Sequence, residues 1–461
     1  MDSAKNLPVA IIGAGPVGLA AAAHLIERGL EPLILEAGPT AGAAIEQWRH
    51  IRLFSPWRYN TDAAAGRLLA ATGWESPEPT ALPTGGDLID GYLTPLASVP
   101  AIASCLHTGA RVVAVTRQGM DRTHSRNRDT TPFVVRVEHA DGEVREYQAA
   151  AVIDASGTWS TRNPLGTSGL PALGEAAAAE KISSPLPDVL GRDRDAFAGR
   201  TAVVIGAGHS AANTLINLTE LATLSPGTKI AWAIRGTSAA KVYGGGDADE
   251  LAARGQLGSR LRTLVENGTI ELHTGFGIAS LATAGGGLTL TSTDGRTLEA
   301  DVVVPATGFR PDLDILRELR LDLDPAVEAP RELGPLIDPE FHSCGTVAPH
   351  GARMLAHPEQ DFYIVGMKSY GRAPTFLLAT GYEQVRSVAA ALAGDREAAD
   401  AVQLELPETG VCSSDVGTSC DVPAAAPAGI AAEPSGGCCG APEPVLVGFP
   451  TGLAHGRSGE N

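Results

Sequence analysis

The chain has 461 residues, of which 44% are apolar, and its formal charge is -18. This length allows two to four domains with sizeable cores, and the negative charge argues against nucleic acid or an anionic membrane as the main partner. We recognise no basic leader and no apolar run of membrane-spanning length, so we expect a cytoplasmic protein.

The first patterned segment, residues 7–38, predicts a strand, a glycine-rich turn, a helix and a second strand. Val9 to Ile12 has the length and apolar character of a buried parallel strand. A turn of the form G-x-G-x-x-G follows, and the run from Leu19 to Arg28 predicts a helix. The second strand, Leu33 to Leu35, ends in Glu36. This order of elements is typical of a dinucleotide-binding unit.

Each part of this unit has a physical role in holding a dinucleotide. Gly13 allows a tight turn, Gly15 lets the backbone approach a pyrophosphate, and Gly18 lets helix and strand pack closely. Pro16 lies in the same turn and is a further candidate contact. The helix N-terminus offers N–H groups to the phosphates, and the Glu36 carboxylate can accept hydrogen bonds from ribose hydroxyls.

The segment after Glu36 is rich in Trp, Arg and Phe and predicts a loop along the cofactor or the substrate. Gln47 and Trp48 are candidate cofactor contacts, although Trp48 and Trp57 could equally pack a small separate core. A helix is predicted from Asp87 to Leu96.

An alternating strand from Arg111 to Arg117 comes next, and its Val113 is a candidate cofactor contact. Segments 133–139 and 144–148 then predict a hairpin around Asp141-Gly142. A buried strand, residues 151–154, leads into an Ala-Ser-Gly turn, where Gly157 is another candidate contact.

A second unit repeats the first. Thr201 to Ile205 predicts a strand, a G-x-G-x-x-A turn follows, and a helix runs to about Leu221. The next strand, residues 229–234, ends in Arg235 instead of an acid. A guanidinium pairs with a 2′-phosphate, so Arg235 favours NADPH over NADH, although it could also be a solvated arginine. A strand at 301–304 then enters a Pro-Ala-Thr-Gly turn. Candidate contacts of this second dinucleotide are Gly206, Gly208, His209, Ser210, Thr307 and Gly308.

The chain then returns to the first unit with a strand at 362–365, a glycine-bearing loop and a helix from about Thr375 to Leu392. Gly366 and Thr375 are candidate cofactor contacts, because a loop and a helix start can place N–H groups beside a cofactor ring. From residue 406 the sequence is rich in Pro, Gly, Ala and Ser and predicts a disordered tail. Four of the six cysteines lie there: Cys412, Cys420, Cys438 and Cys439. No C-x-x-C pair occurs, so neither a disulfide framework nor a metal site is predicted.

This plan resembles the two-dinucleotide flavoproteins, and within them the flavin-containing monooxygenases. The motifs that carry the resemblance are GAGPVG at 13–18, GAGHSA at 206–211 and ATGF at 306–309. A closer resemblance, to flavoprotein monooxygenases encoded in bacterial arsenic-resistance operons, is carried by FSPWRYN at 54–60, HSCGTVAPHG at 342–351, GMKSYGRAPTFLL at 366–378 and PETGVCS at 407–413. One family feature differs, because the Phe-Gly-His motif expected before the second turn has no histidine in residues 173–197.

The resemblance implies an α/β fold of two Rossmann-like domains, with an NADPH domain inserted into an FAD domain. We expect the FAD domain at residues 1–160 and 311–405, the NADPH domain at 161–310 with its core at about 198–300, and the tail at 406–461.

The implied reaction is NADPH-dependent transfer of one oxygen atom from O2 to a soft nucleophile, and the closer resemblance implies a trivalent arsenical as that nucleophile. His350 and Lys368 are candidates for polarising flavin or substrate, though each is more often a satisfied polar residue. Cys344 could face the cofactor or be buried. One alternative is a thiol-linked reductase, whose tail cysteines could also capture a metalloid. Another is a non-catalytic flavin sensor. A homodimer is possible.

Overall fold

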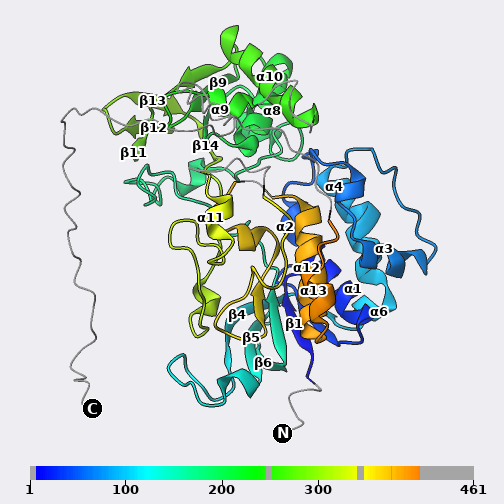
Figure 1. Cartoon of the computed structure of the whole chain (residues 1–461). Helices are drawn as coiled ribbons and strands as arrows, with labels where there is room; N and C mark the ends of the chain where they lie inside the picture. The colour runs from blue at the N-terminus through cyan, green and yellow to red at the C-terminus, as the bar shows by residue number, and fades with distance from the viewer. Residues whose placement is uncertain (1–6, 245–251, 340–346, 375, 405–461) are drawn as a thin grey trace, which may run out of the picture. The chain divides into compact units, whose positions relative to one another are not determined.

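In the computed structural model, the described residues are 7–244, 252–339, 347–374 and 376–404. The first dinucleotide-binding unit is built on a five-stranded parallel sheet of order β15-β7-β1-β2-β3. Figure 1 shows its strand β1, in blue, close to helices α1 and α12. Its strands are β1 (Val9–Ile12), β2 (Pro32–Leu35), β3 (Leu106–His107), β7 (Ala151–Asp154) and β15 (Phe362–Ile364). Strand β15 comes from late in the chain and pairs with β7, so the chain leaves this sheet and returns to it.

The second unit is a four-stranded parallel sheet of order β10-β9-β8-β14, formed entirely by the intervening chain. Its strands are β8 (Thr201–Ile205), β9 (Lys229–Ala233), β10 (Glu271–His273) and β14 (Val302–Pro305). The pairing of β8 with β14 matches the pairing of β1 with β7 in the first unit, because in each case the strand before the glycine-rich turn lies beside the strand that closes the unit.

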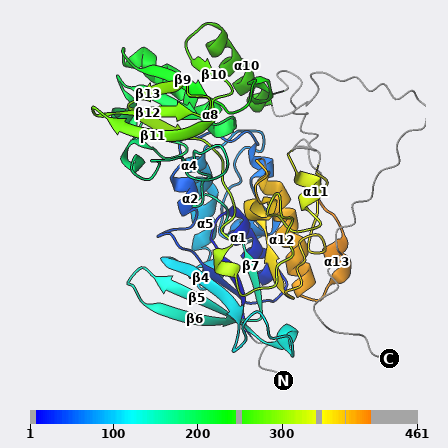
Figure 2. The same cartoon turned by 90° about the vertical axis from the view of Figure 1, so that its left-hand side faces the viewer.

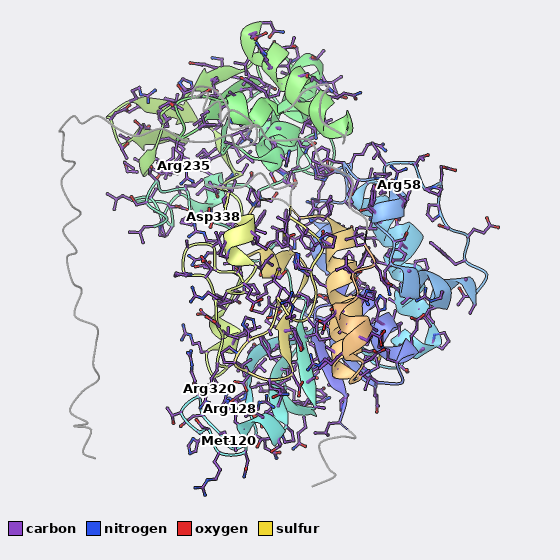
Figure 3. The ribbon with its side chains drawn as sticks, in the orientation of Figure 1. Arg58, Met120, Arg128, Arg235, Arg320 and Asp338 are labelled. Atoms are coloured by element: carbon purple, nitrogen blue, oxygen red, sulfur yellow. The ribbon has the colours of Figure 1, made fainter. Side chains whose placement is uncertain are left out.

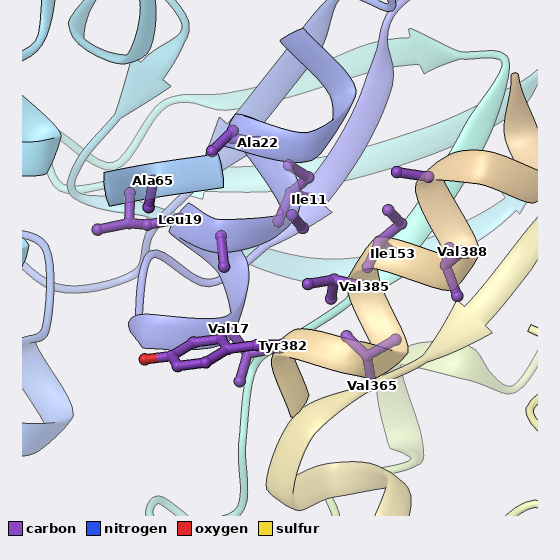
Figure 4. Packing of buried hydrophobic residues seen from close by; sticks show 14 of the residues in the cluster. Ile11, Val17, Leu19, Ala22, Ala65, Ile153, Val365, Tyr382, Val385 and Val388 are labelled. Carbon is purple, nitrogen blue, oxygen red and sulfur yellow. The ribbon is translucent and has the colours of Figure 1, made fainter. Parts of the chain in front are cut away.

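Both parallel sheets have helices on one face and a three-stranded antiparallel sheet on the other. In β1, Val9 and Ile11 pack with α1 (Pro16–Glu27) and α12 (Leu378–Leu392), as Figure 4 shows for Ile11. The alternate residues of β1 pack with β4 (Ala110–Arg117) and β5 (Phe133–His139). Strand β5 lies between β4 and β6 (Val144–Ala149) and pairs with both (Figure 2). This alternation follows from the period of two along a strand.

The second sheet repeats these layers. Alternate residues of β8 pack with α8 (His209–Leu224) and α10 (Ala252–Glu266), or with β11 (Ile278–Ala284) and β12 (Gly287–Ser292). Strand β13 (Thr297–Ala300) completes that antiparallel sheet. The other helical segments are α2 (Ala43–Glu46), η1 (Trp57–Tyr59), α3 (Ala63–Ala70), α4 (Gly85–Leu88), η2 (Ile89–Leu93), α5 (Thr94–Ser98), α6 (Pro100–Ala103), η3 (Arg128–Thr130), η4 (Ala179–Lys181), α7 (Arg194–Phe197), α9 (Ala240–Tyr243), η6 (Asp314–Leu316), α11 (Gly334–Ile337), η7 (Gly366–Tyr370) and α13 (Arg396–Asp400).

Some predicted bounds differ from the structure. Helix α1 begins at Pro16, three residues earlier than predicted, because Gly15 is its N-cap and proline is well suited to the first helical position. The helix predicted over residues 87–96 is three consecutive segments, α4, η2 and α5, of which η2 is a π-type turn. Helix α12 starts at Leu378, a few residues after the predicted start.

The architecture confirms the predicted α/β fold with two Rossmann-like units. The boundaries of the domains stay a prediction, and the predicted tail lies outside the described residues. Among the described helices, none combines the length and the apolar composition needed to span a membrane.

Candidate cofactor and active site

The first glycine-rich turn is packed closely at two glycines and open at the third. Gly13 has φ +99°, and a Cβ added to it would lie 2.9 Å from the Ala155 carbonyl oxygen. A Cβ added to Gly18 would lie 2.0 Å from the Gly13 carbonyl oxygen. By contrast, a Cβ on Gly15 would meet no atom within 4 Å. Gly15 is also the N-cap of α1 and supplies no side-chain cap, so the helix N-terminus is available to a phosphate.

Glu36 follows β2 and borders this turn. Its Oε2 accepts a hydrogen bond from the Ala14 N–H at 2.7 Å, and its Oε1 accepts one from the Gly38 N–H at 2.7 Å. A carboxylate has about four lone-pair directions. The two backbone bonds therefore fix the orientation of the carboxylate and still leave acceptor capacity for ribose hydroxyls.

The second glycine-rich turn has the same construction. Gly206 has φ +131°, and a Cβ there would lie 2.0 Å from the Ala306 carbonyl oxygen. Gly208 is the N-cap of α8, supplies no side-chain cap, and has open space at its Cβ position. Thr307 and Gly308 form the closing turn, which is tied to Asn163 by the bond from Thr307 Oγ1 to the Asn163 carbonyl at 2.7 Å. Each unit thus presents a helix start without a side-chain cap and with open space at its N-cap glycine.

Arg235 lies two residues after the end of β9, on the exposed side of the second unit (Figure 3). Its guanidinium makes no hydrogen bond or ion pair with any other residue in the part of the chain that the structure describes. The group is therefore available to an anionic ligand at the strand end where an adenosine ribose lies in dinucleotide-binding folds.

A cavity of about 540 Å³ connects the two glycine-rich turns. Its lining includes Glu36 at the first turn, Trp48, and Asn213 in α8 of the second unit. Further predicted contacts that line it are Gly13, Gly15, Pro16, Gly157, His209, Ser210 and Gly366. Residues from both units therefore border one space, which is what electron transfer between two dinucleotides requires.

Other predicted residues lie outside the described lining of this cavity. Gly18 and Gly206 pack closely against backbone within their turns, Thr307 is half-buried, and Gly208, Gly308, Arg235 and Gln47 are exposed. Val113 lies on β4 and is 36% exposed. Thr375, Cys344 and the four tail cysteines, Cys412, Cys420, Cys438 and Cys439, lie outside the described residues.

His350 and Lys368 are buried behind the cavity instead of lining it. Lys368 Nζ donates to Asp154 Oδ2 at 2.6 Å and to Ser156 Oγ at 3.0 Å. His350 Nδ1 bonds the Ala348 carbonyl at 3.0 Å, and its Nε2 lies 2.9 Å from Gln384 Nε2. Burial lowers the pKa of His350, which favours a neutral ring that donates from Nδ1 and accepts at Nε2. Neither residue is among those that line the cavity, and their predicted catalytic roles stay predictions.

Aromatic residues that the sequence analysis did not single out form much of the cavity wall. The Trp159 and Phe309 rings lie 4.9 Å apart, and Trp48 lies 6.4 Å from Trp159. Phe54 lies 5.1 Å from His209. The sequence does carry a signal for Trp159 and Phe309. Each follows within two residues the small-residue turn that closes its unit, at residues 155–157 and 305–308.

Thiol and metal chemistry have little support in the described part of the chain. Cys105 is the described cysteine, and burial raises its pKa to about 11, so its thiol is poorly ionised near neutral pH. The described residues also contain no group of three His, Cys, Asp or Glu side chains arranged to hold a metal ion.

Two dinucleotide-binding units that share one cavity define an oxidoreductase that uses FAD and a nicotinamide dinucleotide. The chain belongs to the pyridine nucleotide-disulphide oxidoreductase family, whose sequence model matches residues 10–331. A search of curated protein sequences found no match.

Solved structures share the fold at low sequence identity. A bacillithiol disulfide reductase from Bacillus cereus superposes with a TM-score of 0.61 at 20% identity, covering 84% of this chain and 99% of its own. The FAD-bound cadaverine monooxygenase of desferrioxamine biosynthesis from Erwinia amylovora gives 0.58 at 15%, covering 89% and 99%. An ornithine hydroxylase from Pseudomonas aeruginosa gives 0.56 at 15%, covering 84% and 99%. At these identities the likeness establishes the fold, which reductases and monooxygenases share.

Proposed function

We propose that this protein is an NADPH-dependent FAD monooxygenase that transfers one oxygen atom from O2 to a soft nucleophile. The observation that carries the proposal is the cavity shared by both units, whose wall is largely apolar and aromatic. Oxygen transfer to a substrate needs a site from which water is excluded, since water diverts reactive oxygen species to side reactions.

In this proposal the first unit holds FAD and the second holds NADPH. FAD supplies the redox and oxygen chemistry, and the protein supplies binding, orientation and the electrostatic surroundings. The residues that would contact FAD are Gly13, Gly15, Pro16, Gly18, Glu36, Gln47, Trp48, Val113, Gly157, Gly366 and Thr375. The NADPH contacts would be Gly206, Gly208, His209, Ser210, Arg235, Thr307 and Gly308. Arg235 supports NADPH because its guanidinium, which bonds to no other residue in the described part of the chain, can bind the 2′-phosphate.

A trivalent arsenical is the proposed oxygen acceptor, on the strength of the motif resemblance. Its lone pair makes it a soft nucleophile, and oxygen transfer would convert it to the pentavalent state while NADPH supplies two electrons and O2 supplies the atom. The second oxygen atom leaves as water, so the reaction balances. Arsenite, neutral near neutral pH, is compatible with a largely apolar cavity wall.

Stopped-flow absorbance tests the proposal. The purified holoenzyme is reduced with NADPH without oxygen and then mixed with aerated buffer, with and without arsenite. We expect a transient near-ultraviolet band before the oxidised flavin spectrum returns, and a faster decay of that band with arsenite. Direct return of oxidised flavin, unaffected by arsenite but with electrons passed to a disulfide, would instead identify a thiol-linked reductase.

A matched variant addresses the cysteines. Replacing Cys344 and the four tail cysteines with Ser removes every thiol except that of Cys105. A monooxygenase should keep its oxygen-dependent NADPH consumption in this variant, whereas a thiol-linked reductase should lose turnover. A selective loss of arsenite affinity would show that the tail captures the metalloid.

A further inference from the structure

A fully buried ion pair lies directly behind the cavity. The side chains of Lys368 and Asp154 are both 0% exposed, and Lys368 Nζ lies 2.6 Å from Asp154 Oδ2. Asp154 is the last residue of β7, and Lys368 lies in η7, just after the neighbouring strand β15. Ser156 hydrogen-bonds to both members of the pair. Its hydroxyl donates to Asp154 Oδ1 at 2.6 Å and accepts from Lys368 Nζ at 3.0 Å.

The pair joins two turns that line the cavity. The first is the closing turn at residues 155–157, and the second begins with Gly366 and Met367. Both turns also contact the first glycine-rich unit, because Gly13 packs on Ala155, and a Cβ on Gly366 would lie 3.3 Å from the Val17 side chain. The position of the pair therefore affects the surroundings in which FAD binds.

Gly366 and Ser369 of η7 also take part in a neutral hydrogen-bond network. Gln384 Oε1 accepts the Gly366 N–H at 2.8 Å, and Gln384 Nε2 donates to Ser369 Oγ and lies against His350 Nε2, both at 2.9 Å. Because burial lowers the pKa of His350, this network carries no charge near neutral pH. Lys368 of η7 and Asp154 at the end of β7 are thus a charged pair beside this neutral network.

We propose that Lys368 and Asp154 are positioning residues whose mutual neutralisation sets the electrostatic potential at the flavin. A buried charge that loses its partner is poorly screened and acts over a long range. Reduction gives the flavin negative charge. An unpaired Asp154 carboxylate would therefore disfavour the reduced flavin, whereas an unpaired Lys368 ammonium would favour it. This inference requires bound FAD but does not depend on oxygen transfer or on the identity of the substrate.

The test compares the flavin midpoint potential in purified holoenzyme variants at neutral pH, by spectroelectrochemical titration with reference dyes. We expect Lys368→Met to shift the potential in the negative direction and Asp154→Asn to shift it in the positive direction. The double variant should have a potential close to that of the wild type, because both charges are removed. Lys368→Arg should also have a potential close to that of the wild type, because it keeps the positive charge. Glu146→Gln breaks an ion pair with Arg136 whose two side chains are more than half exposed, so solvent screens the remaining charge and the potential should stay unchanged.

The opposite signs separate the proposal from a purely structural role. If the pair only holds the two turns together, both single variants loosen the same wall, and their potentials move in the same direction or not at all. Either result would overturn the proposal. If Lys368→Met does not retain FAD, comparing Asp154→Asn with the double variant still isolates the charge of Lys368, because replacing both members of a buried pair by neutral groups is often tolerated. Equal potentials in those two variants would also overturn it.

Discussion

Adding one methyl group to different glycines of the same turn should separate cofactor binding from folding. Gly15 has φ -76°, which alanine adopts readily, and its added Cβ meets no protein atom within 4 Å. Gly15→Ala should therefore cost about 1 kcal/mol of folding free energy or less, the usual range for a change at an N-cap. Gly18→Ala places a Cβ 2.0 Å from a backbone oxygen, so strand and helix must separate, at a cost of about 1–3 kcal/mol or more.

The methyl group of Gly15→Ala enters the space that the pyrophosphate would occupy. We expect the apoprotein to unfold within about 4 °C of the wild type, since about 1 kcal/mol shifts the melting temperature by about 2–4 °C in a domain of about 150–250 residues and by less in a larger one. The FAD dissociation constant should rise at least about tenfold, or about 1.4 kcal/mol. Calorimetry of the apoprotein and FAD titration by fluorescence quenching measure the two quantities independently.

The second unit supplies the matched control. Gly208 has φ -104° and open space at its Cβ position, so Gly208→Ala should also fold normally. It should weaken NADPH binding by about tenfold and spare FAD affinity. Wild-type FAD affinity in Gly15→Ala, or equal loss of both cofactors in Gly208→Ala, would refute the assignment of one dinucleotide to each turn.

Three further predictions concern charged and titratable groups. Arg235→Ala should raise the Michaelis constant for NADPH about tenfold through loss of a charge-assisted bond, while sparing that for NADH; equal effects on both would remove the 2′-phosphate contact. Glu359→Gln should lower the free energy of unfolding by about 3–5 kcal/mol in denaturant titrations, because it leaves the buried Arg117 and Arg128 without their carboxylate; a loss below about 1 kcal/mol would contradict this. Burial lowers the pKa of His357 to about 4, below its pKa of about 6.5 in the unfolded chain. The free energy of unfolding should therefore fall by about 3 kcal/mol as the pH is lowered from about 6.5 toward 4, because the unfolded chain then binds a proton that the folded protein does not. His357→Gln should make the free energy of unfolding less dependent on pH in this range.

Local patterns in the sequence were sufficient to predict the two cofactor-binding turns. The strand bounds at Val9–Ile12, Ala151–Asp154 and Thr201–Ile205 are confirmed, since short apolar runs next to glycine-rich turns carry their own signal. The spacing of glycines also predicted where close packing occurs, because steric limits on φ and on close contacts act within a few residues. The assignment of each turn to a particular cofactor stays a prediction.

The cavity wall and the buried polar network could not be predicted in the same way. Lys368 pairs with an aspartate 214 residues earlier, and Trp159 packs on Phe309 across the inserted unit. Such contacts depend on tertiary packing and leave no periodic trace in the sequence. A lysine or histidine beside a glycine-rich loop therefore suggests a catalytic group, whereas the structure shows that both side chains have their hydrogen-bonding partners behind the cavity.

Because reductases and monooxygenases share this fold, the groups that border the cavity must distinguish between the two activities. A thiol-linked reductase needs a reactive cysteine within reach of the flavin, and the described lining contains none, while the described Cys105 has a raised pKa. Oxygen transfer needs instead a wall that keeps water out and holds few charges. Glu36 and Arg52 are the charged side chains among the described lining residues, and both carboxylate oxygens of Glu36 are held by backbone N–H groups. The neutralised pair of Lys368 and Asp154 extends this low-charge environment behind the wall, which is why its disruption should be detectable as a change in flavin potential.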